Sequence, residues 1–270
     1  MPASDLVARP ERGRRFTAAA RVRLSDVSIV GRLRLDSIAR MLQDVSSDDT
    51  ADAAYADEVA WVVRWLVIEL DPEARMPRLY DDVSLVTWCS GTGPRWAERR
   101  TDIGNAGTVV VRAAALWVFV DAATGRPIPL GDGFDAVYGE AAGGRRVGQR
   151  LRHDPPPEGA PGRPWPVRFT DFDVLGHVTN AAYWFPVEET LSELAPESRV
   201  TRAELEFRAG IDPGDAVEMI TVLNDDGRSD RDTARELHLW LTVPGESGGS
   251  EVRASAVVTL APGGGSGRRF

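Results

Sequence analysis

The stretch VRFTDFDVLGHVTN, residues 167–180, has a partial copy, VRLSDVSIVGRL, at residues 22–33. The copies align without a gap, and their valine, arginine, first aspartate and glycine are identical. Most of the remaining positions exchange one apolar or hydroxyl-bearing residue for another. A repeated motif of this kind indicates internal duplication. The sequence therefore predicts two similar structural units in one chain.

The two copies differ where an acid and a base could act together. The later copy has Asp173 and His177, and the earlier copy has Ser28 and Arg32 at these positions. A carboxylate and an imidazole in one loop ahead of a helix can act on the same bound carbonyl group. The difference indicates that the later unit performs chemistry and that the earlier unit shapes the site.

Length and composition are those of a soluble globular protein. The 270 residues, 43% hydrophobic and 27% charged, are enough for two domains of ordinary size. A net charge of −9 argues against a general nucleic-acid or anionic-membrane binder. Cys89 is the one cysteine, which excludes an internal disulfide and fits a reducing compartment. With no signal-peptide pattern and no apolar run that could span a membrane, we expect a cytoplasmic location.

The N-terminal half is expected to contain one strand, one helix and four further strands. The first strand is expected over 16–24, and Asp36 is expected to cap a helix with apolar residues at helical spacing from Ile38 to Val45. The acidic stretch 48–57 is expected to be a loop or lid. The four strands, rich in Val, Trp and Ile, are expected over 60–70, 83–90, 95–103 and 108–120. This order is that of the hotdog fold, an antiparallel sheet wrapped round a long helix.

The C-terminal half repeats this order. A short strand at the start of the 167–180 stretch leads into a helix capped by Thr179 or Asn180, and Pro186 is expected to kink that helix. Four strands are then expected over 199–208, 215–224, 233–243 and 251–260. The predicted fold class is therefore α+β, with two tandem hotdog units.

Five blocks of sequence, in order, carry a resemblance to a known family. They are SDVSIVGRLRLDSIARMLQDVSSD (25–48), GTGPRWAERRTDI (91–103), LWVFVDAATGRPIPL (116–130), DFDVLGHVTNAAY (171–183) and LEFR (205–208). Over 16–262 the chain resembles the acyl-ACP thioesterases, tandem-hotdog enzymes that hydrolyse acyl-carrier-protein thioesters at the end of fatty-acid synthesis. The Asp173 pattern also looks like the catalytic-aspartate loop of single-domain acyl-CoA thioesterases of the hotdog class.

The resemblance makes Asp173 the catalytic aspartate and His177 the catalytic histidine. Two positions depart from the family pattern. Leu175 stands where the family usually has an asparagine. Gly210 and Ile211 align with a glutamate that is often followed by a cysteine. The carboxamide and glutamate roles are therefore unassigned.

For thioester hydrolysis, Asp173 is expected to act either as the general base or as the nucleophile. His177 would position the water or polarise the carbonyl. Backbone N–H groups of Gly176 and Val178 would bind the developing oxyanion. Asn180 is either a helix cap or a catalytic amide.

Other polar residues have structural interpretations. Asp171, present in both copies, is expected to be a cap or turn residue, and Cys89 a small buried strand residue. Glu206 is a weak candidate to replace the family glutamate. No metal-binding or nucleotide-binding motif is found, so no metal and no cofactor are predicted. The remaining residues expected to be structural or on the surface are His153, His238, Glu188 and Glu189.

The expected domain organisation has five segments. They are a mobile segment (1–15), a tunnel-shaping non-catalytic hotdog (16–120), a linker (121–162), a catalytic hotdog (163–262) and a disordered tail (263–270).

Hydrolysis of fatty acyl-ACP to free fatty acid is the expected function. The alternatives are an acyl-CoA thioesterase and a non-catalytic acyl-binding or regulatory protein. The expected partner is acyl carrier protein or a CoA thioester, with no nucleic acid and no membrane span, in a monomer or homodimer. Arginines that could contact an acidic carrier are Arg145, Arg146, Arg150, Arg152 and Arg163.

Overall fold

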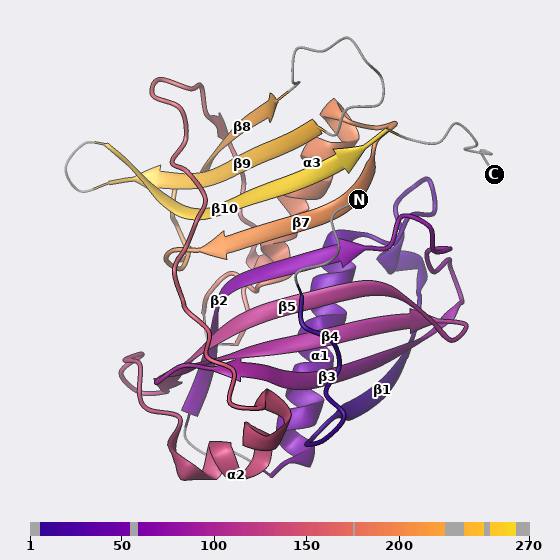
Figure 1. Cartoon of the computed structure of the whole chain (residues 1–270). Coiled ribbons are helices and arrows are strands. Elements are labelled where there is room, and N and C mark those ends of the chain that lie inside the picture. Colours follow the sequence, from indigo (N-terminus) through magenta and orange to yellow (C-terminus); the bar gives the residue numbers. More distant parts are fainter. Residues whose placement is uncertain (1–5, 55–58, 175, 225–234, 246–248, 263–270) are drawn as a thin grey trace. The chain divides into compact units, whose positions relative to one another are not determined.

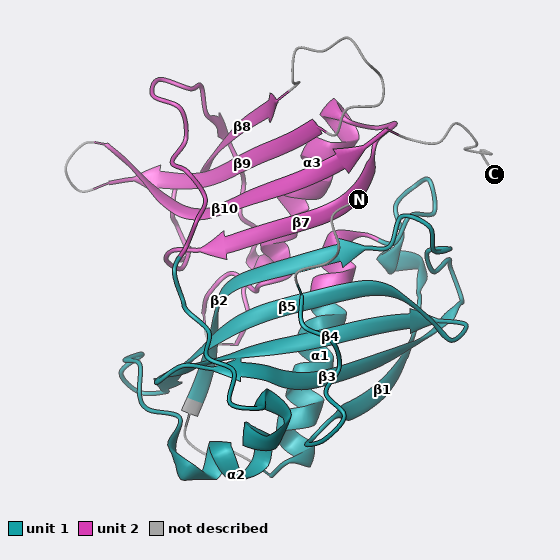
Figure 2. Ribbon diagram, in the orientation of Figure 1, with its two compact units in different colours: residues 1–33, 40–150 teal, residues 34–39, 151–270 magenta. Residues whose placement is uncertain are grey.

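The computed structural model describes residues 6–54, 59–174, 176–224, 235–245 and 249–262. The chain divides into two compact units (Figures 1 and 2). Unit 1 comprises residues 1–33 and 40–150, and unit 2 comprises residues 34–39 and 151–270. The predicted disordered tail, 263–270, lies outside the described residues.

Unit 1 is an antiparallel sheet with strand order β1-β3-β4-β5-β2, and α1 lies against one face of it (Figure 1). Neighbouring strands pair without crossovers inside the β3-β4-β5 meander. The elements are β1 (Phe16–Arg21), η1 (Leu24–Asp26), α1 (Leu35–Asp52), β2 (Val59–Leu70), β3 (Asp82–Thr92), β4 (Trp96–Asn105), β5 (Thr108–Asp121) and α2 (Gly131–Ala142).

Unit 2 repeats this plan with a shorter helix. Its antiparallel strand order is β7-β10-β9-β8-β6, which corresponds to unit 1 read from β2 to β1, with the short β6 in the place of β1. The elements are β6 (Arg163–Pro164), η2 (Phe169–Asp171), η3 (Ala182–Trp184), α3 (Phe185–Leu194), β7 (Arg199–Phe207), β8 (Glu218–Asn224), β9 (Arg235–Pro244) and β10 (Ser250–Ala261).

The helical spacing predicted for α1 is confirmed, because Ile38, Met41 and Val45 are all buried. The predicted loop or lid at 48–57 is wrong for its first part, since α1 continues to Asp52. Asp49 is only 1% exposed and accepts charged hydrogen bonds, which keeps this acidic end of the helix folded against unit 1. Residues 55–58 lie outside the described residues.

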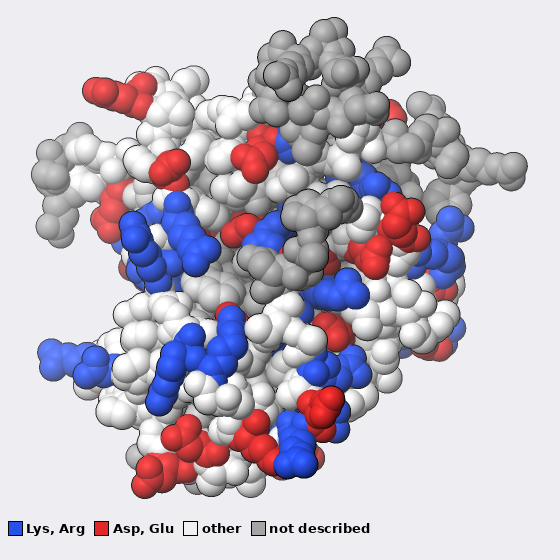
Figure 3. All heavy atoms as spheres, in the orientation of Figure 1, with Lys and Arg blue, Asp and Glu red and all other residues white. Residues whose placement is uncertain are grey.

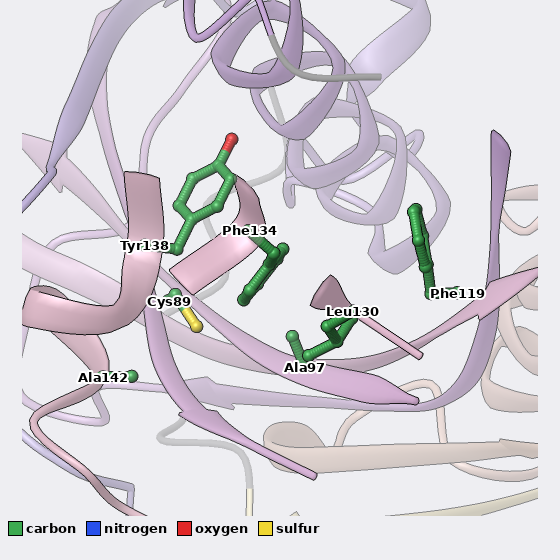
Figure 4. Close-up of a cluster of buried hydrophobic side chains, with 7 residues drawn as sticks. All are labelled: Cys89, Ala97, Phe119, Leu130, Phe134, Tyr138 and Ala142. Atoms are coloured by element: carbon green, nitrogen blue, oxygen red, sulfur yellow. The ribbon is translucent and has the colours of Figure 1, made fainter. Parts of the chain in front are cut away.

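The predicted linker over 121–162 contains α2, which its sequence pattern does not reveal. Phe134 and Tyr138 from α2 are buried (Figure 4). The Phe134 ring lies 5.8 Å from that of Trp61. Phe134 and Tyr138 are the two large residues that this helix buries fully, and Val137 is partly buried, so its period is hard to see in sequence. The buried cluster of unit 1 consists of Cys89, Ala97, Phe119, Leu130, Phe134, Tyr138 and Ala142.

Cys89 lies inside this cluster, 2% exposed, and burial raises the pKa of its thiol to about 11. The thiol is therefore protonated at neutral pH and is a poor nucleophile. The prediction of a small buried strand residue is confirmed.

The N-terminal segment is better ordered than predicted. Residues 1–5 lie outside the described residues, but 6–15 are anchored to unit 1 by arginines. Arg9 pairs with Asp102 at 3.2 Å, and Arg14 pairs with Asp49 at 2.7 Å. Arginine-rich composition suggested mobility, whereas buried acceptors bind these side chains.

Helix α3 begins later than expected. Thr179 and Asn180 precede a 3-10 turn, η3, and the N-cap residues of η3 and α3 are Ala181 and Trp184. Pro186 is therefore in the first turn of α3, where its missing N–H would have had no intrahelical partner. The expected kink within the helix is a wrong prediction for this reason.

Glu188 of α3 binds the first turn of α1 within unit 2. Its Oε1 accepts the backbone N–H of Leu35 at 2.6 Å, where the helix dipole favours negative charge. We expect Glu188→Ala to lower the free energy of unfolding by about 1.5–3 kcal/mol, because a charged hydrogen bond to a buried backbone group is lost. The measurement is urea denaturation beside Glu189→Ala, an exposed neighbour expected to change stability by about 0.5 kcal/mol or less. Equal effects of the two substitutions would contradict the assigned role.

Candidate active site

The two copies of the repeated motif fold alike, and the residues that they share form the frame. In each copy a 3-10 helix, η1 or η2, ends on a buried aspartate, Asp26 or Asp171. Its carboxylate accepts the backbone N–H of the arginine three residues earlier, at 2.7 Å in the first copy and 2.8 Å in the second. The prediction that Asp171 is a turn residue is confirmed. The strand expected at the start of 167–180 is wrong, since η2 occupies that place.

The loop that follows, residues 171–179, is here called the site loop. Asp173 N–H donates to the carbonyl oxygen of His177 at 2.9 Å, and Gly176 N–H donates to that of Asp173 at 3.0 Å. The first copy has the same two bonds, at 2.7 and 2.9 Å. Gly31 and Gly176 have φ of 75° and 78°, values that residues with a Cβ rarely adopt. The shared glycine thus allows the turn that brings residues 173 and 177 together.

The Asp173 side chain is exposed at the start of this turn. Its Oδ1 accepts the backbone N–H of His177 at 3.4 Å, and Ser28 Oγ accepts the equivalent N–H, of Arg32, at 3.2 Å. The local bond therefore survives in both copies, and the negative charge is what distinguishes the second. The exposed, charged carboxylate of Asp173 is therefore the feature that the second copy adds to the shared frame.

The imidazole of His177 is 60% exposed and faces the segment that follows β7. Its Nδ1 lies 3.4 Å from Oδ1 of Asp212. A Cβ added at Gly210 would lie 3.4 Å from the same nitrogen, so this glycine is directly beside the ring. The position that aligns with the family glutamate is thus next to His177, and Asp212 presents a carboxylate from two residues further along.

Sequence reasoning did not single out Asp212. A usable signal was present, because Asp212-Pro213-Gly214-Asp215 is a turn sequence with an aspartate at each end, directly after the position aligned with the family glutamate.

The remaining candidates are placed as follows. The Gly176 N–H is engaged within the turn, which leaves it no hydrogen for an oxyanion in this conformation. Val178 pairs with Phe172 in an isolated antiparallel bridge. The hydrogen bonds of this bridge are made by the neighbouring residues: Asp173 N–H donates to His177, and Thr179 N–H donates to Asp171. The Val178 N–H is therefore directed away from Phe172. Asn180 is half-buried in the turn before η3 and is not the N-cap residue of either helix. Leu175 lies outside the described residues.

Apolar side chains are exposed beside the acid. Phe169 and Val174, which flank Asp173 in the chain, are 93% and 102% exposed. Their counterparts in the first copy, Leu24 and Ile29, are exposed as well, at 74% and 96%. The site loop thus combines a carboxylate, an imidazole and apolar surface.

Glu206 has a structural role. Its carboxylate accepts the backbone N–H groups of Arg152 and His153, and Arg208 lies 3.5 Å from it. The His153 ring nitrogen Nδ1 lies 3.0 Å from the Ser255 hydroxyl on the neighbouring strand. These contacts attach residues 152–153 to the sheet of unit 2, and Glu206 is occupied by them.

Burial lowers the pKa of His153 below its ordinary value of 6.5. As pH falls below about 6.5, the unfolded chain binds a proton that the folded chain resists, so stability is expected to decrease. A difference of one pKa unit between the folded and the unfolded chain changes the free energy of unfolding by about 1.4 kcal/mol. Urea denaturation between about pH 5 and pH 7.5 should show this decrease in the wild type and a smaller one in His153→Gln. Identical pH dependence in the two proteins would refute this expectation.

Two family profiles match this chain, one in its N-terminal half and one in its C-terminal half. The profile of the acyl-ACP thioesterase N-terminal domain matches residues 13–138, and that of the C-terminal domain matches residues 158–254. A Mycobacterium tuberculosis protein of uncharacterised function is 30% identical over 236 residues, covering 83% of this chain and 93% of that protein. This chain, a tandem-hotdog protein with both family domains in order, belongs to the acyl-ACP thioesterase family.

Solved structures share the fold at lower identity. The 12:0-ACP thioesterase from Umbellularia californica has a TM-score of 0.75 and 18% identity, over 92% of this chain and 94% of that one. An acyl-ACP thioesterase from Bacteroides thetaiotaomicron has a TM-score of 0.72 and 21% identity, over 91% and 97%. The predicted fold class of two tandem hotdog units is confirmed. Family and fold together support thioester hydrolysis.

No helix within the described residues is long and apolar enough to cross a membrane. Within the same residues, no group of three or more His, Cys, Asp or Glu side chains is arranged to hold a metal ion.

Proposed function

We propose that this protein hydrolyses fatty acyl-ACP thioesters to free fatty acid and carrier protein. The observation that carries the proposal is the site loop, where Asp173 and His177 occur on a frame whose other copy has serine and arginine. Val174 in this loop and Phe169 in η2, just before it, are exposed and could contact an acyl chain. Family membership supplies the thioester chemistry.

In the proposed reaction Asp173 acts as the general base toward water or as the nucleophile on the carbonyl carbon. A positioned general base contributes about 10²–10⁴-fold to rate. Negative charge develops on the carbonyl oxygen, and the Val178 N–H, which is directed away from Phe172, is proposed as its backbone donor. One such donor contributes about 10²–10³-fold. Asn180, close along the chain, is proposed as a further polar contact.

The carrier is acidic, so contact with this acidic protein requires local positive charge. Figure 3 shows arginines on both units in small groups beside acidic side chains. Arg145 is paired with Glu98 at 2.5 Å and Arg163 with Glu193 at 2.8 Å. These two arginines are already neutralised. The proposal for carrier contact therefore rests on Arg146, Arg150 and Arg152, whose side chains are exposed.

An acyl-CoA thioesterase is the second candidate, because the proposed chemistry of Asp173 and His177 acts on the thioester group, which acyl-ACP and acyl-CoA share. The deciding assay compares hydrolysis of acyl-ACP and acyl-CoA over a ladder of chain lengths with purified protein. Preference for acyl-ACP supports the proposal, and preference for acyl-CoA supports the second candidate. Acyl binding without turnover on either carrier would favour a non-catalytic binding protein. Membership of the acyl-ACP thioesterase family is also the basis for proposing a cytoplasmic location and a role in fatty-acid synthesis. In this proposal the N-terminal unit shapes the tunnel that holds the acyl chain.

A further inference from the structure

The segment between β7 and β8 is held firmly behind the His177 imidazole. Arg208 and Ala209 N–H groups both donate to the carbonyl oxygen of Arg253, at 2.8 and 3.2 Å. Ile211 is 1% exposed and makes a backbone hydrogen bond with the hydroxyl of Tyr183. Because Tyr183 belongs to η3, directly after the site loop, this bond ties the two segments together.

Tyr183 is itself fixed in place. Its ring packs edge-on against Phe207 with 5.1 Å between centroids, and burial raises the pKa of its hydroxyl to about 12. The hydroxyl therefore stays protonated over the working pH range. Rigid placement of Ile211 by this residue also determines where the next residue, Asp212, stands.

Asp212 is fixed on its other side by a turn. Its N–H donates to Oδ2 of Asp215 at 2.9 Å, and Asp215 N–H donates to the Asp212 carbonyl oxygen at 3.1 Å. The intervening Gly214 has φ of 95°, which the turn requires. The backbone bonds of Asp212 are satisfied within the turn, and its Oδ1 faces the imidazole, 3.4 Å from Nδ1.

The other candidate carboxylates have different contacts. Asp173 accepts the backbone N–H of His177, and Glu206 accepts those of Arg152 and His153. Gly210, at the position aligned with the family glutamate, has no side chain to offer. A separation of 3.4 Å is long for a hydrogen bond, but catalytic hydrogen bonds are often long before substrate binds.

We propose that Asp212 is the positioning residue for His177, a role that rests on the proposed function. Its carboxylate accepts the Nδ1–H of the ring and so selects the tautomer with an unprotonated Nε2. Nε2 then accepts a hydrogen bond from the water or group at the thioester. Asp212 thus does from a turn what a side chain at 210 would do from the neighbouring position.

The first test reads the tautomer directly, without substrate. Nitrogen-15 NMR of the substrate-free protein reports which ring nitrogen of His177 carries the hydrogen in the neutral form. There are three histidines in the chain, so His177→Gln assigns the signal. We expect mainly Nδ1–H in the wild type and a shift toward Nε2–H in Asp212→Ala. An unchanged tautomer in Asp212→Ala would overturn the proposal.

The second test uses rescue. We expect Asp212→Asn and Asp212→Ala to lower kcat by about tenfold or more with little change in KM, because an orienting carboxylate acts through the imidazole. Asp212→Glu should restore much of the rate. So should Gly210→Glu combined with Asp212→Ala, since a Cβ at 210 would make ordinary van der Waals contact with the ring. Failure of both carboxylate variants to restore either kcat or the wild-type tautomer would count against the proposal.

The matched control is Asp215→Asn, which alters the same turn without touching the imidazole. It is expected to lower stability but to leave the tautomer of His177 unchanged. If Asp215→Asn shifts the tautomer as much as Asp212→Ala does, the effect belongs to the turn and the proposal fails. If the wild type hydrolyses no thioester, the proposed function fails, while the NMR comparison still decides the role of Asp212.

Discussion

Replacing Asp173 by asparagine is expected to lower kcat about 10²–10⁴-fold, because a neutral amide can neither accept the proton from water nor attack the carbonyl. The fold should survive. Asparagine retains an oxygen that can accept the His177 N–H, the bond that Oδ1 of Asp173 makes at 3.4 Å. The measurement is steady-state hydrolysis of the best acyl-ACP substrate, with circular dichroism to confirm folding.

A sharper variant is Asp173→Ser, which copies the residue that the first unit carries on the same frame. Ser28 Oγ accepts the equivalent N–H at 3.2 Å, so serine is already known to fit this turn. We expect the same loss of rate as with asparagine. Ser28→Asp is the reciprocal control. It should leave the rate unchanged, because the first copy has Arg32 at the position that corresponds to His177. A serine or asparagine variant with the wild-type rate would remove Asp173 from the mechanism.

Asp49→Ala is expected to lower the free energy of unfolding by about 3–5 kcal/mol, since it removes two charged hydrogen bonds from partly buried arginines. The Asp49 side chain is 1% exposed and binds Arg14 at 2.7 Å and Arg99 at 2.5 Å. Arg99 also lies 5.4 Å from the centre of the Tyr138 ring. The single carboxylate therefore joins the N-terminal segment, α1, β4 and, through Arg99, α2. Chemical denaturation followed by tryptophan fluorescence would measure the change.

Asp52→Ala is the matched control for this substitution. Asp52 binds Arg14 at 2.6 Å, but its side chain is 58% exposed. Water screens such a pair, and the expected loss is about 1 kcal/mol or less. If both substitutions cost the same, burial is not what makes the Asp49 interactions strong.

Local pattern was sufficient for most of the architecture. The apolar spacing from Ile38 to Val45 predicted α1 because a helix with that spacing buries one stripe, and the structure buries it. The strands other than the one expected at the start of 167–180 were predicted to within a few residues for a similar reason, and the repeated motif predicted the duplicated frame. Pattern failed at 48–57 and at α2, where the ion pairs of Asp49 and the packing of Phe134 and Tyr138 decide the conformation. Both depend on residues distant in sequence.

The sequence by itself determined the family, the tandem hotdog fold and the loop that carries Asp173 and His177, because these are encoded in contiguous residues and in their repetition. Only the tertiary structure decided which carboxylate lies beside the imidazole. Residues 177 and 212 belong to segments separated by α3 and β7, and their approach follows from the packing of Tyr183 and Ile211. The tertiary structure also assigned Glu206 to the attachment of residues 152–153. Contacts of this kind arise from chain folding in three dimensions, and no local spacing encodes them.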